Sequence, residues 1–215
     1  MNGSYLRLRR TFRLPTLLPV ILISFFLCFS FPTHIEQSVN WHFQRRSNPV
    51  LAHHAKALSA LSAYIATRFH LPLKTAETIT RQAYLAAHTN KVEATLVLAI
   101  VAVESSYQPH AVNTVSGARG LMQVLPRWHR REVERIGGTA ALFHIKPNID
   151  VGTAILAKYL KWERGRLAPA LGRYWGSMHC KVYVYRVKRQ LRHLNRVLKS
   201  VRRTDSLFTQ RESST

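Results

Sequence analysis

Glu104 is the residue in this sequence best suited to acid–base chemistry, because it ends a long run of apolar residues. From Ala94 to Val103 every residue except Thr95 is apolar, a pattern typical of a helix buried on nearly all sides. Burial disfavours the charged form of a carboxyl group and so raises its pKa. A carboxyl that keeps its proton near neutral pH can act as a general acid. The structural alternatives are a core glutamate paired with Arg119 and a residue at a frayed helix end.

A loop with two glycines follows this segment and leads to a second group of candidate residues. Gly117 and Gly120 frame the loop, and glycine permits backbone turns that other residues resist. The string G-L-M-Q begins at Gly120, after the E-S pair at Glu104. Each string is weak evidence alone, but the two together, behind an apolar helix, form a specific combination.

This combination resembles the catalytic motifs of the lytic transglycosylases, a goose-lysozyme-like family that cleaves the glycan of bacterial cell walls. The E-S pair at Glu104 is similar to the first motif of the family, and G-L-M-Q at Gly120 to the second. The string N-I-D-V-G-T from Asn148 resembles a helix start of the family, and Y-V-Y-R-V from Tyr183 resembles its Y-P-x-x-V pattern. The resemblance covers about residues 93–187.

The resemblance implies a reaction and a set of site residues. Glu104 would act as both acid and base in cleaving the bond between N-acetylmuramic acid and N-acetylglucosamine, with formation of a 1,6-anhydro ring and without a cofactor. No other acid lies between Glu93 and Glu132, and a single carboxylate suits chemistry assisted by the N-acetyl group of the substrate, since ordinary glycosidases use two. The residues expected to bind substrate are Ser105, Gly120, Met122, Gln123, Tyr174, Trp175 and Tyr183.

Several of these residues have plain structural alternatives. Ser105 could be a helix cap, Met122 and Tyr174 could fill the core, and Tyr183 could be an aromatic on a helix surface. Trp175 stands where the family has an asparagine, and indole only donates hydrogen bonds, whereas an amide also accepts them. Trp175 could stack on a sugar or fill the cleft. A catalytically weak wall-binding module of the same fold, or a hydrolytic muramidase, therefore remains an alternative function.

The spacing of apolar residues predicts an all-α fold, a single lysozyme-like helical domain over residues 50–203. Asp150 is expected near a helix start, where a carboxylate suits the helix dipole. Gly, Pro and Asn mark the ends of most segments. The expected helices are 50–69, 75–89, 92–107, 119–125, 127–136, about 148–163, 167–175 and 181–202.

The N-terminal segment has the pattern of an export signal. Four arginines precede an almost wholly apolar run over residues 14–32, and basic residues stay on the cytoplasmic side. We expect residues 1–32 to be a signal peptide or a retained signal anchor, residues 33–49 a linker, and residues 204–215 a disordered tail. The domain is therefore expected in the periplasm or cell envelope, with inner-membrane anchoring if the segment is kept.

The chain is strongly basic, with 32 Lys and Arg against 10 Asp and Glu and a formal net charge of +22. Such a charge favours polyanionic partners, and the predicted export argues against nucleic acid. The basic helix over 181–202 is either a solvated face or a contact with anionic envelope material. No metal site is expected, because the 11 histidines show no H-E-x-x-H spacing.

Overall fold

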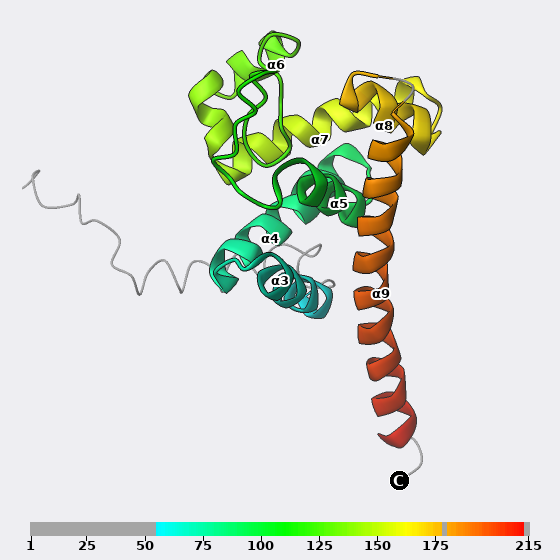
Figure 1. Cartoon of the computed structure of the whole chain (residues 1–215). Coiled ribbons are helices and arrows are strands. Elements are labelled where there is room, and N and C mark those ends of the chain that lie inside the picture. Colours follow the sequence, from blue (N-terminus) through cyan, green and yellow to red (C-terminus); the bar gives the residue numbers. More distant parts are fainter. Residues whose placement is uncertain (1–54, 178–179, 213–215) are drawn as a thin grey trace, which may run out of the picture. The chain divides into compact units, whose positions relative to one another are not determined.

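Helix α5 (Ala94–Ser105) lies at the centre of the fold, with other helices around it (Figure 1). The computed structural model describes residues 55–177 and 180–212, with side chains as far as residue 203, all within one unit spanning residues 45–215. The predicted signal segment and linker lie outside the described residues. The described part consists of helices without strands, which confirms the predicted all-α class.

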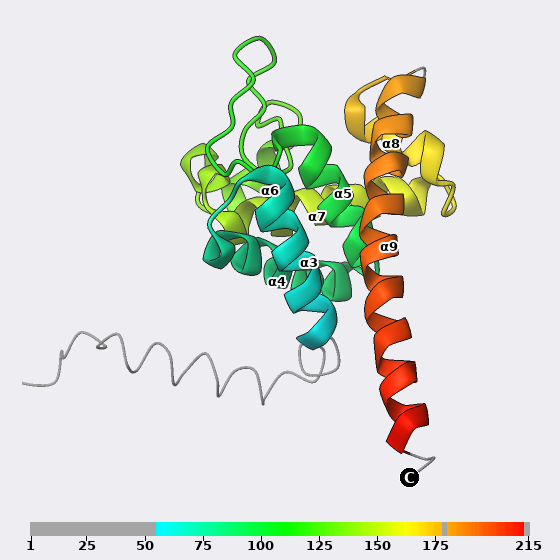
Figure 2. The ribbon, with the colours of Figure 1, turned by 60° about the horizontal axis from the view of Figure 1, so that its bottom comes forward.

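The other helices pack around α5 or against its neighbours. Helix α4 (Leu73–Asn90) and helix α9 (Lys181–Glu212) both contact α5, and Figure 2 shows the three from a second direction. The remaining elements are α3 (Ala55–Phe69), α6 (Arg130–Arg135), the short 3₁₀ helix η1 (Thr139–Phe143), α7 (Ile145–Trp162) and α8 (Leu167–Trp175).

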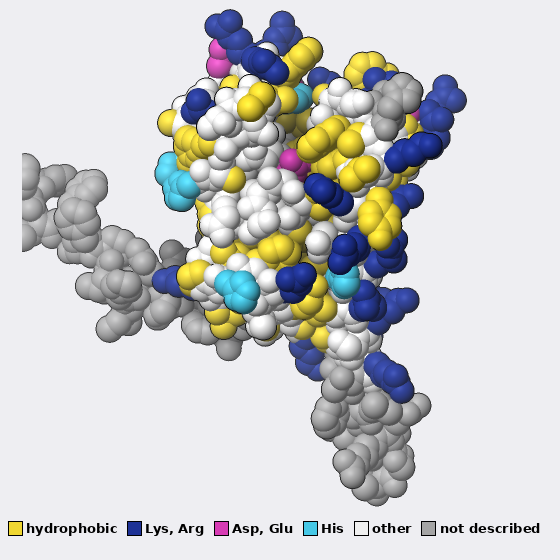
Figure 3. All heavy atoms as spheres, in the orientation of Figure 1, with side chains coloured by type: hydrophobic (Ala, Val, Ile, Leu, Met, Phe, Trp, Pro, Cys, Tyr) yellow, Lys and Arg dark blue, Asp and Glu magenta, His cyan; other side chains and the backbone are white. Residues whose placement is uncertain are grey.

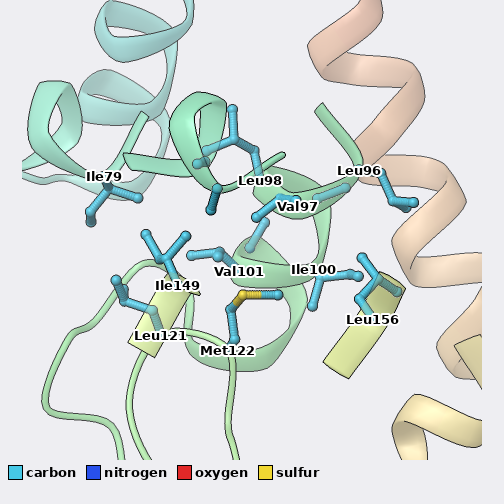
Figure 4. Packing of buried hydrophobic residues seen from close by; sticks show 14 of the residues in the cluster. Ile79, Leu96, Val97, Leu98, Ile100, Val101, Leu121, Met122, Ile149 and Leu156 are labelled. Atoms are coloured by element: carbon cyan, nitrogen blue, oxygen red, sulfur yellow. The ribbon is translucent and has the colours of Figure 1, made fainter. Parts of the chain in front are cut away.

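The core forms where α4, α5, α7 and the loop before α6 meet. Val97, Leu98, Ile100 and Val101 of α5 are fully buried, and residues from the other elements close around them (Figure 4). Burying one such aliphatic side chain contributes roughly 1.5–3 kcal/mol to folding. The side chains that meet them are Ile79 of α4, Leu121 and Met122 of the loop, and Ile149 and Leu156 of α7.

The loop over 119–125 differs from its predicted form. It contains turns and two isolated antiparallel bridges, Val112 with Arg119 and Arg119 with Val124, so the predicted short helix is wrong. Gly120 and Gln123 both have positive φ angles, 74° and 47°, which a right-handed helix cannot hold. Side chains of other elements satisfy the backbone of this loop in place of helical hydrogen bonds.

Helix α7 begins earlier than predicted, at Ile145 instead of Asn148 or Asp150. Pro147 falls in its first turn, where the missing N–H of proline costs no helical hydrogen bond. Asp150 therefore lies inside the helix and not at its start. Its carboxylate accepts hydrogen bonds from Gln82 and Lys146.

Helix α9 continues to Glu212 and so ends later than the predicted boundary at residue 202. It also passes through most of the segment for which the sequence predicts a disordered tail. Its first half packs through the buried side chains of Tyr183, Val187 and Leu194, and it contacts α3, α5 and α8. The first turn of α9 consequently lies next to the last turn of α5, where Glu104 stands.

Candidate active site

The carboxyl group of Glu104 is half-buried at the end of α5 and is held by a tyrosine from α9. The Tyr183 hydroxyl donates a hydrogen bond to Glu104 Oε1 at 2.6 Å. Burial raises the pKa of Glu104 to about 7, although the hydrogen bond from Tyr183 acts in the opposite direction. Near neutral pH the group therefore holds its proton about half of the time. This suits a group that must both donate and accept a proton.

Arg119, the alternative partner for Glu104, lies elsewhere. Its guanidinium carbon is 5.6 Å from the centre of the Phe143 ring, a cation–π arrangement. Within the described part of the chain, the pKa of Glu104 is shifted by burial and by the hydrogen bond from Tyr183. No charge from a second described carboxylate contributes to this shift. Glu104 is thus not the neutralised half of an ion pair.

Tyr183 is itself covered by Trp175. The Tyr183 side chain is 2% exposed, and the Trp175 ring stacks on it with centroids 4.7 Å apart and planes 25° apart. Trp175 remains 50% exposed, so one part of its surface is available to a ligand. The structure therefore brings Glu104, Tyr183 and Trp175 together, and Tyr183 contacts both of the others.

Ser105 joins α5 to the loop that follows Gly120. Its hydroxyl lies within hydrogen-bonding distance of the carbonyl oxygens of Leu121, at 2.8 Å, and Val101, at 3.1 Å. Ser105 is buried, so it does not face solvent as a ligand-binding group would, and the C-cap position of α5 belongs to Ser106. Its position indicates that it holds the loop against the helix that carries Glu104.

Met122 contributes to the site through its backbone. The side chain is fully buried and packs on Gly152, at which an added Cβ would come within 2.5 Å of the sulfur. The backbone carbonyl of Met122 accepts a hydrogen bond from the Tyr174 hydroxyl at 2.8 Å. Met122 cannot line a sugar subsite with its side chain in this position, and Tyr174 holds the loop in place.

Gln123 is the member of the G-L-M-Q string that is partly exposed. Its side-chain amide nitrogen donates to the carbonyl oxygens of Ala111 and Gly120, at 3.1 and 2.9 Å. The amide oxygen is then the atom left to accept a hydrogen bond from a ligand. Gln123 is partly exposed, in keeping with the predicted substrate-binding role, which stays a prediction.

Asn148 is a site residue that the sequence analysis missed. It is fully buried, its Oδ1 accepts from the Met122 amide at 2.7 Å, and its Nδ2 donates to the carbonyls of Arg119 and Leu142. One side chain thereby holds the backbone directly before the G-L-M-Q string and within it. The N-I-D-V-G-T string contained the signal, but it was interpreted as a helix start instead of a loop anchor.

Four of the other described acids have basic partners, and the remaining two, Glu77 and Glu93, are exposed. Glu163 is buried, and a hydrogen bond from Arg173, helped by Arg166, holds the pKa of Glu163 below its usual value. The remaining close pairs are Lys146 with Asp150, Lys158 with Glu132, and Arg130 with Glu134. Among the residues described, Glu104 is therefore the carboxylate whose surroundings suit proton transfer.

The hydrogen bond from Tyr183 makes a direct prediction about Glu104. In Tyr183→Phe the carboxylate loses a donor that stabilises its charged form, so the pKa of Glu104 should rise by about one further unit. Carbon-13 NMR titration of the glutamate side chains measures this shift. Tyr185→Phe, on an exposed tyrosine of the same helix, should leave the titration unchanged. Equal titrations in the two variants would show that the hydrogen bond does not act on the acid.

Comparisons with known proteins match the same part of the chain. The sequence model of the family described as the transglycosylase SLT domain matches residues 83–203. The membrane-bound lytic murein transglycosylase C of Photorhabdus laumondii is 40% identical over 72 residues, and its counterpart in a Yersinia pestis strain is 42% identical over the same length. Each match covers 31% of this chain and 20% of the relative, so the chain spans about a fifth of the length of the relatives it matches.

A solved structure was also found, an inactive mutant of the lytic transglycosylase Slt from Pseudomonas aeruginosa, with 18% identity and a TM-score of 0.43. That likeness covers 56% of this chain and 23% of the other.

Within the described residues, no helix has the length and apolar character needed to cross a bilayer. The family match spans more than half of the chain and all eight candidate residues from Glu104 to Tyr183, so the chain belongs to the transglycosylase SLT domain family.

Proposed function

We propose that this protein is a peptidoglycan lytic transglycosylase, which cleaves the β-1,4 bond between N-acetylmuramic acid and N-acetylglucosamine. The observation that carries the proposal is a single half-buried carboxyl, Glu104, whose pKa burial raises to about 7 and whose orientation Tyr183 fixes. The relatives named as membrane-bound lytic murein transglycosylases support the substrate class. We place the activity in the periplasm or cell envelope, with residues 1–32 as export signal or anchor.

The reaction needs one residue that first donates and then accepts a proton. Protonated Glu104 donates to the glycosidic oxygen while the bond from that oxygen to C1 of the muramic acid breaks. The N-acetyl group of the same sugar stabilises the positive charge that develops at C1. The Glu104 carboxylate then takes the proton of the 6-hydroxyl, whose oxygen bonds to C1 and closes the 1,6-anhydro ring. Glu104 regains its proton and no water is consumed, so the cleavage is of the lyase type.

The other residues position the acid and the glycan. Tyr183 orients the carboxyl, and the exposed indole of Trp175 offers a flat surface on which a sugar ring can stack. The Gln123 amide oxygen accepts from a sugar hydroxyl. Ser105, Gly120, Met122 and Tyr174 act indirectly, because they hold the loop that presents Gln123.

The products of digestion test the proposal. Purified peptidoglycan is incubated with the full chain, and the soluble fragments are analysed by mass spectrometry. We expect fragments that end in 1,6-anhydro-muramic acid, which are lighter by one water than fragments with reducing ends.

Each other result has a clear meaning. Reducing ends would replace the transglycosylase by a hydrolytic muramidase of the same fold. Intact peptidoglycan that still retains the bound protein would point to a wall-binding module, in which Trp175 serves glycan binding alone. Peptidoglycan incubated in parallel with the Glu104→Gln variant controls for spontaneous release of fragments.

A further inference from the structure

One side of helix α9 carries a row of exposed lysine and arginine side chains. At 3.6 residues per turn the members fall within one sector of the helix surface, about a quarter of its circumference. Figure 3 shows Lys and Arg side chains gathered over the part of the surface that α9 forms. This row, called the basic stripe below, consists of Lys181, Lys188, Arg189, Arg192, Arg196 and Lys199, all of them exposed.

The basic stripe lies on the opposite side of α9 from the candidate active site. Tyr183, Val187 and Leu194 form the buried side of the helix, and the centre of the stripe is roughly half a turn around the helix from them. A surface that contacts the stripe would therefore not cover Glu104. The stripe extends over about 27 Å along the helix, so a broad partner is needed to contact all of it.

The charges of the stripe are not compensated within the described part of the protein. No ion pair joins any of its six members to a described carboxylate, and residues 181–203 contain no acid. Like charges three and four residues apart destabilise a helix. Half-buried His193 lies beside the stripe, and its pKa is lowered by burial and by Arg196, Arg189, Arg68 and Arg192. Arg68 belongs to α3, so a second element adds to the positive potential.

The residues at the start of the stripe favour a lipid partner over a purely polar polymer. Tyr185 lies within the same sector and Val182 beside it, 58% and 62% exposed. Tyrosine is enriched where a protein meets the boundary between lipid headgroups and water, and basic residues beside it attract anionic lipids. We propose that the basic stripe docks on the headgroups of an anionic phospholipid bilayer. The sequence predicted a contact with anionic envelope material of unspecified kind, and this proposal names lipid as that material. The proposal does not depend on the lytic activity.

Lipid vesicles test the proposal on the full chain. The stripe variant carries Arg189→Gln, Arg192→Gln and Arg196→Gln, and the control carries Arg127→Gln, Arg131→Gln and Arg135→Gln. The control residues are exposed on and before α6, and both variants lose three charges. Sedimentation with vesicles of phosphatidylcholine, with and without 30 mol% phosphatidylglycerol, gives the binding constants at low and high salt.

We expect the wild type to bind the anionic vesicles more tightly at low salt, and the stripe variant to lose roughly 100-fold of that affinity. The control variant should lose less than about 5-fold. Binding through residues 1–32 is the same in all three chains, so it does not contribute to the difference between the two variants.

Three results would overturn the proposal. One is an equal loss in the two variants, which would indicate general attraction by net charge. Another is wild-type binding that does not depend on phosphatidylglycerol. The third is a stripe variant that keeps vesicle binding and loses binding to purified peptidoglycan, which would assign the stripe to a wall polymer. Lytic assays on soluble glycan in the three chains separate these results from failure of the proposed activity.

Discussion

Glu104→Gln is expected to abolish lytic activity while making the protein more stable at alkaline pH. The amide has the shape of the protonated acid but cannot transfer a proton in either step. General acid–base groups contribute on the order of 10²–10⁴-fold in rate, and here one group serves twice, so we expect a fall of at least about 10³-fold. Release of anhydro-ended fragments measures it.

The effect on stability follows from linkage between protonation and folding. The pKa of Glu104 is about 7 in the folded protein against a model value of 4.5, so folding favours the protonated carboxyl. The protonated Glu104 carboxyl contributes fully to the stability of the folded protein below pH 4.5, and this contribution is lost as the pH rises through 7. Above pH 7 the wild type therefore carries a penalty on the order of 3 kcal/mol that Gln avoids.

Urea unfolding at pH 4.5 and pH 8 measures this difference. Glu104→Gln should match the wild type at the lower pH and exceed it at the higher pH, with most of the change between pH 4.5 and 7. Glu77→Gln, at an exposed position on α4, is the matched control and should show no such trend. A constant difference across this range would mean that burial does not perturb Glu104. Lost activity without the pH trend would keep the catalytic role of Glu104 but remove its electrostatic explanation.

Gly120→Ala is expected to cost at least about 3 kcal/mol of folding free energy. Gly120 has a φ of 74°, and an added Cβ would overlap the Leu142 carbonyl oxygen and the side-chain amide of Asn148. Neither neighbour can move freely, because Asn148 already holds the Met122 amide and the Leu142 carbonyl. The substitution therefore breaks the anchor of the loop as well as straining its backbone.

Gly117 provides a matched control for the strain alone. Its φ is 77°, but no atom lies within 4 Å of an added Cβ. Gly117→Ala should cost only about 1 kcal/mol, the penalty of alanine in left-handed backbone. Equilibrium unfolding in urea compares the two variants. Equal losses of folding free energy would show that the overlap of the added Cβ with Leu142 and Asn148 does not destabilise the protein.

The sequence was most informative where the pattern was local. The apolar run of α5 predicted a buried helix, and its one acid, Glu104, proved to be half-buried with a raised pKa. Helix α8 was predicted with its observed limits, residues 167–175, because glycines mark both of its ends.

The sequence was least informative where a side chain of one element satisfies the backbone of another. The hydrogen bonds from Ser105 to Leu121, Tyr174 to Met122 and Met122 to Asn148 join segments 16 to 52 residues apart. Hydrophobic periodicity carries no information on such pairs. The resemblance to the family predicts that Met122 lines the site, whereas its side chain fills the core, the structural alternative that the sequence left open.

The hydrogen bond between Glu104 and Tyr183 also has a consequence for the newly made chain. The two residues are 79 positions apart, and Tyr183 belongs to α9, which follows the other described helices along the chain. Until α9 has packed on α5, Glu104 stays in contact with water and ionises as an ordinary glutamate. A chain in which α9 has not yet packed therefore has no such proton to offer, and under the proposed function we expect it to cut glycan only after α9 has docked on α5.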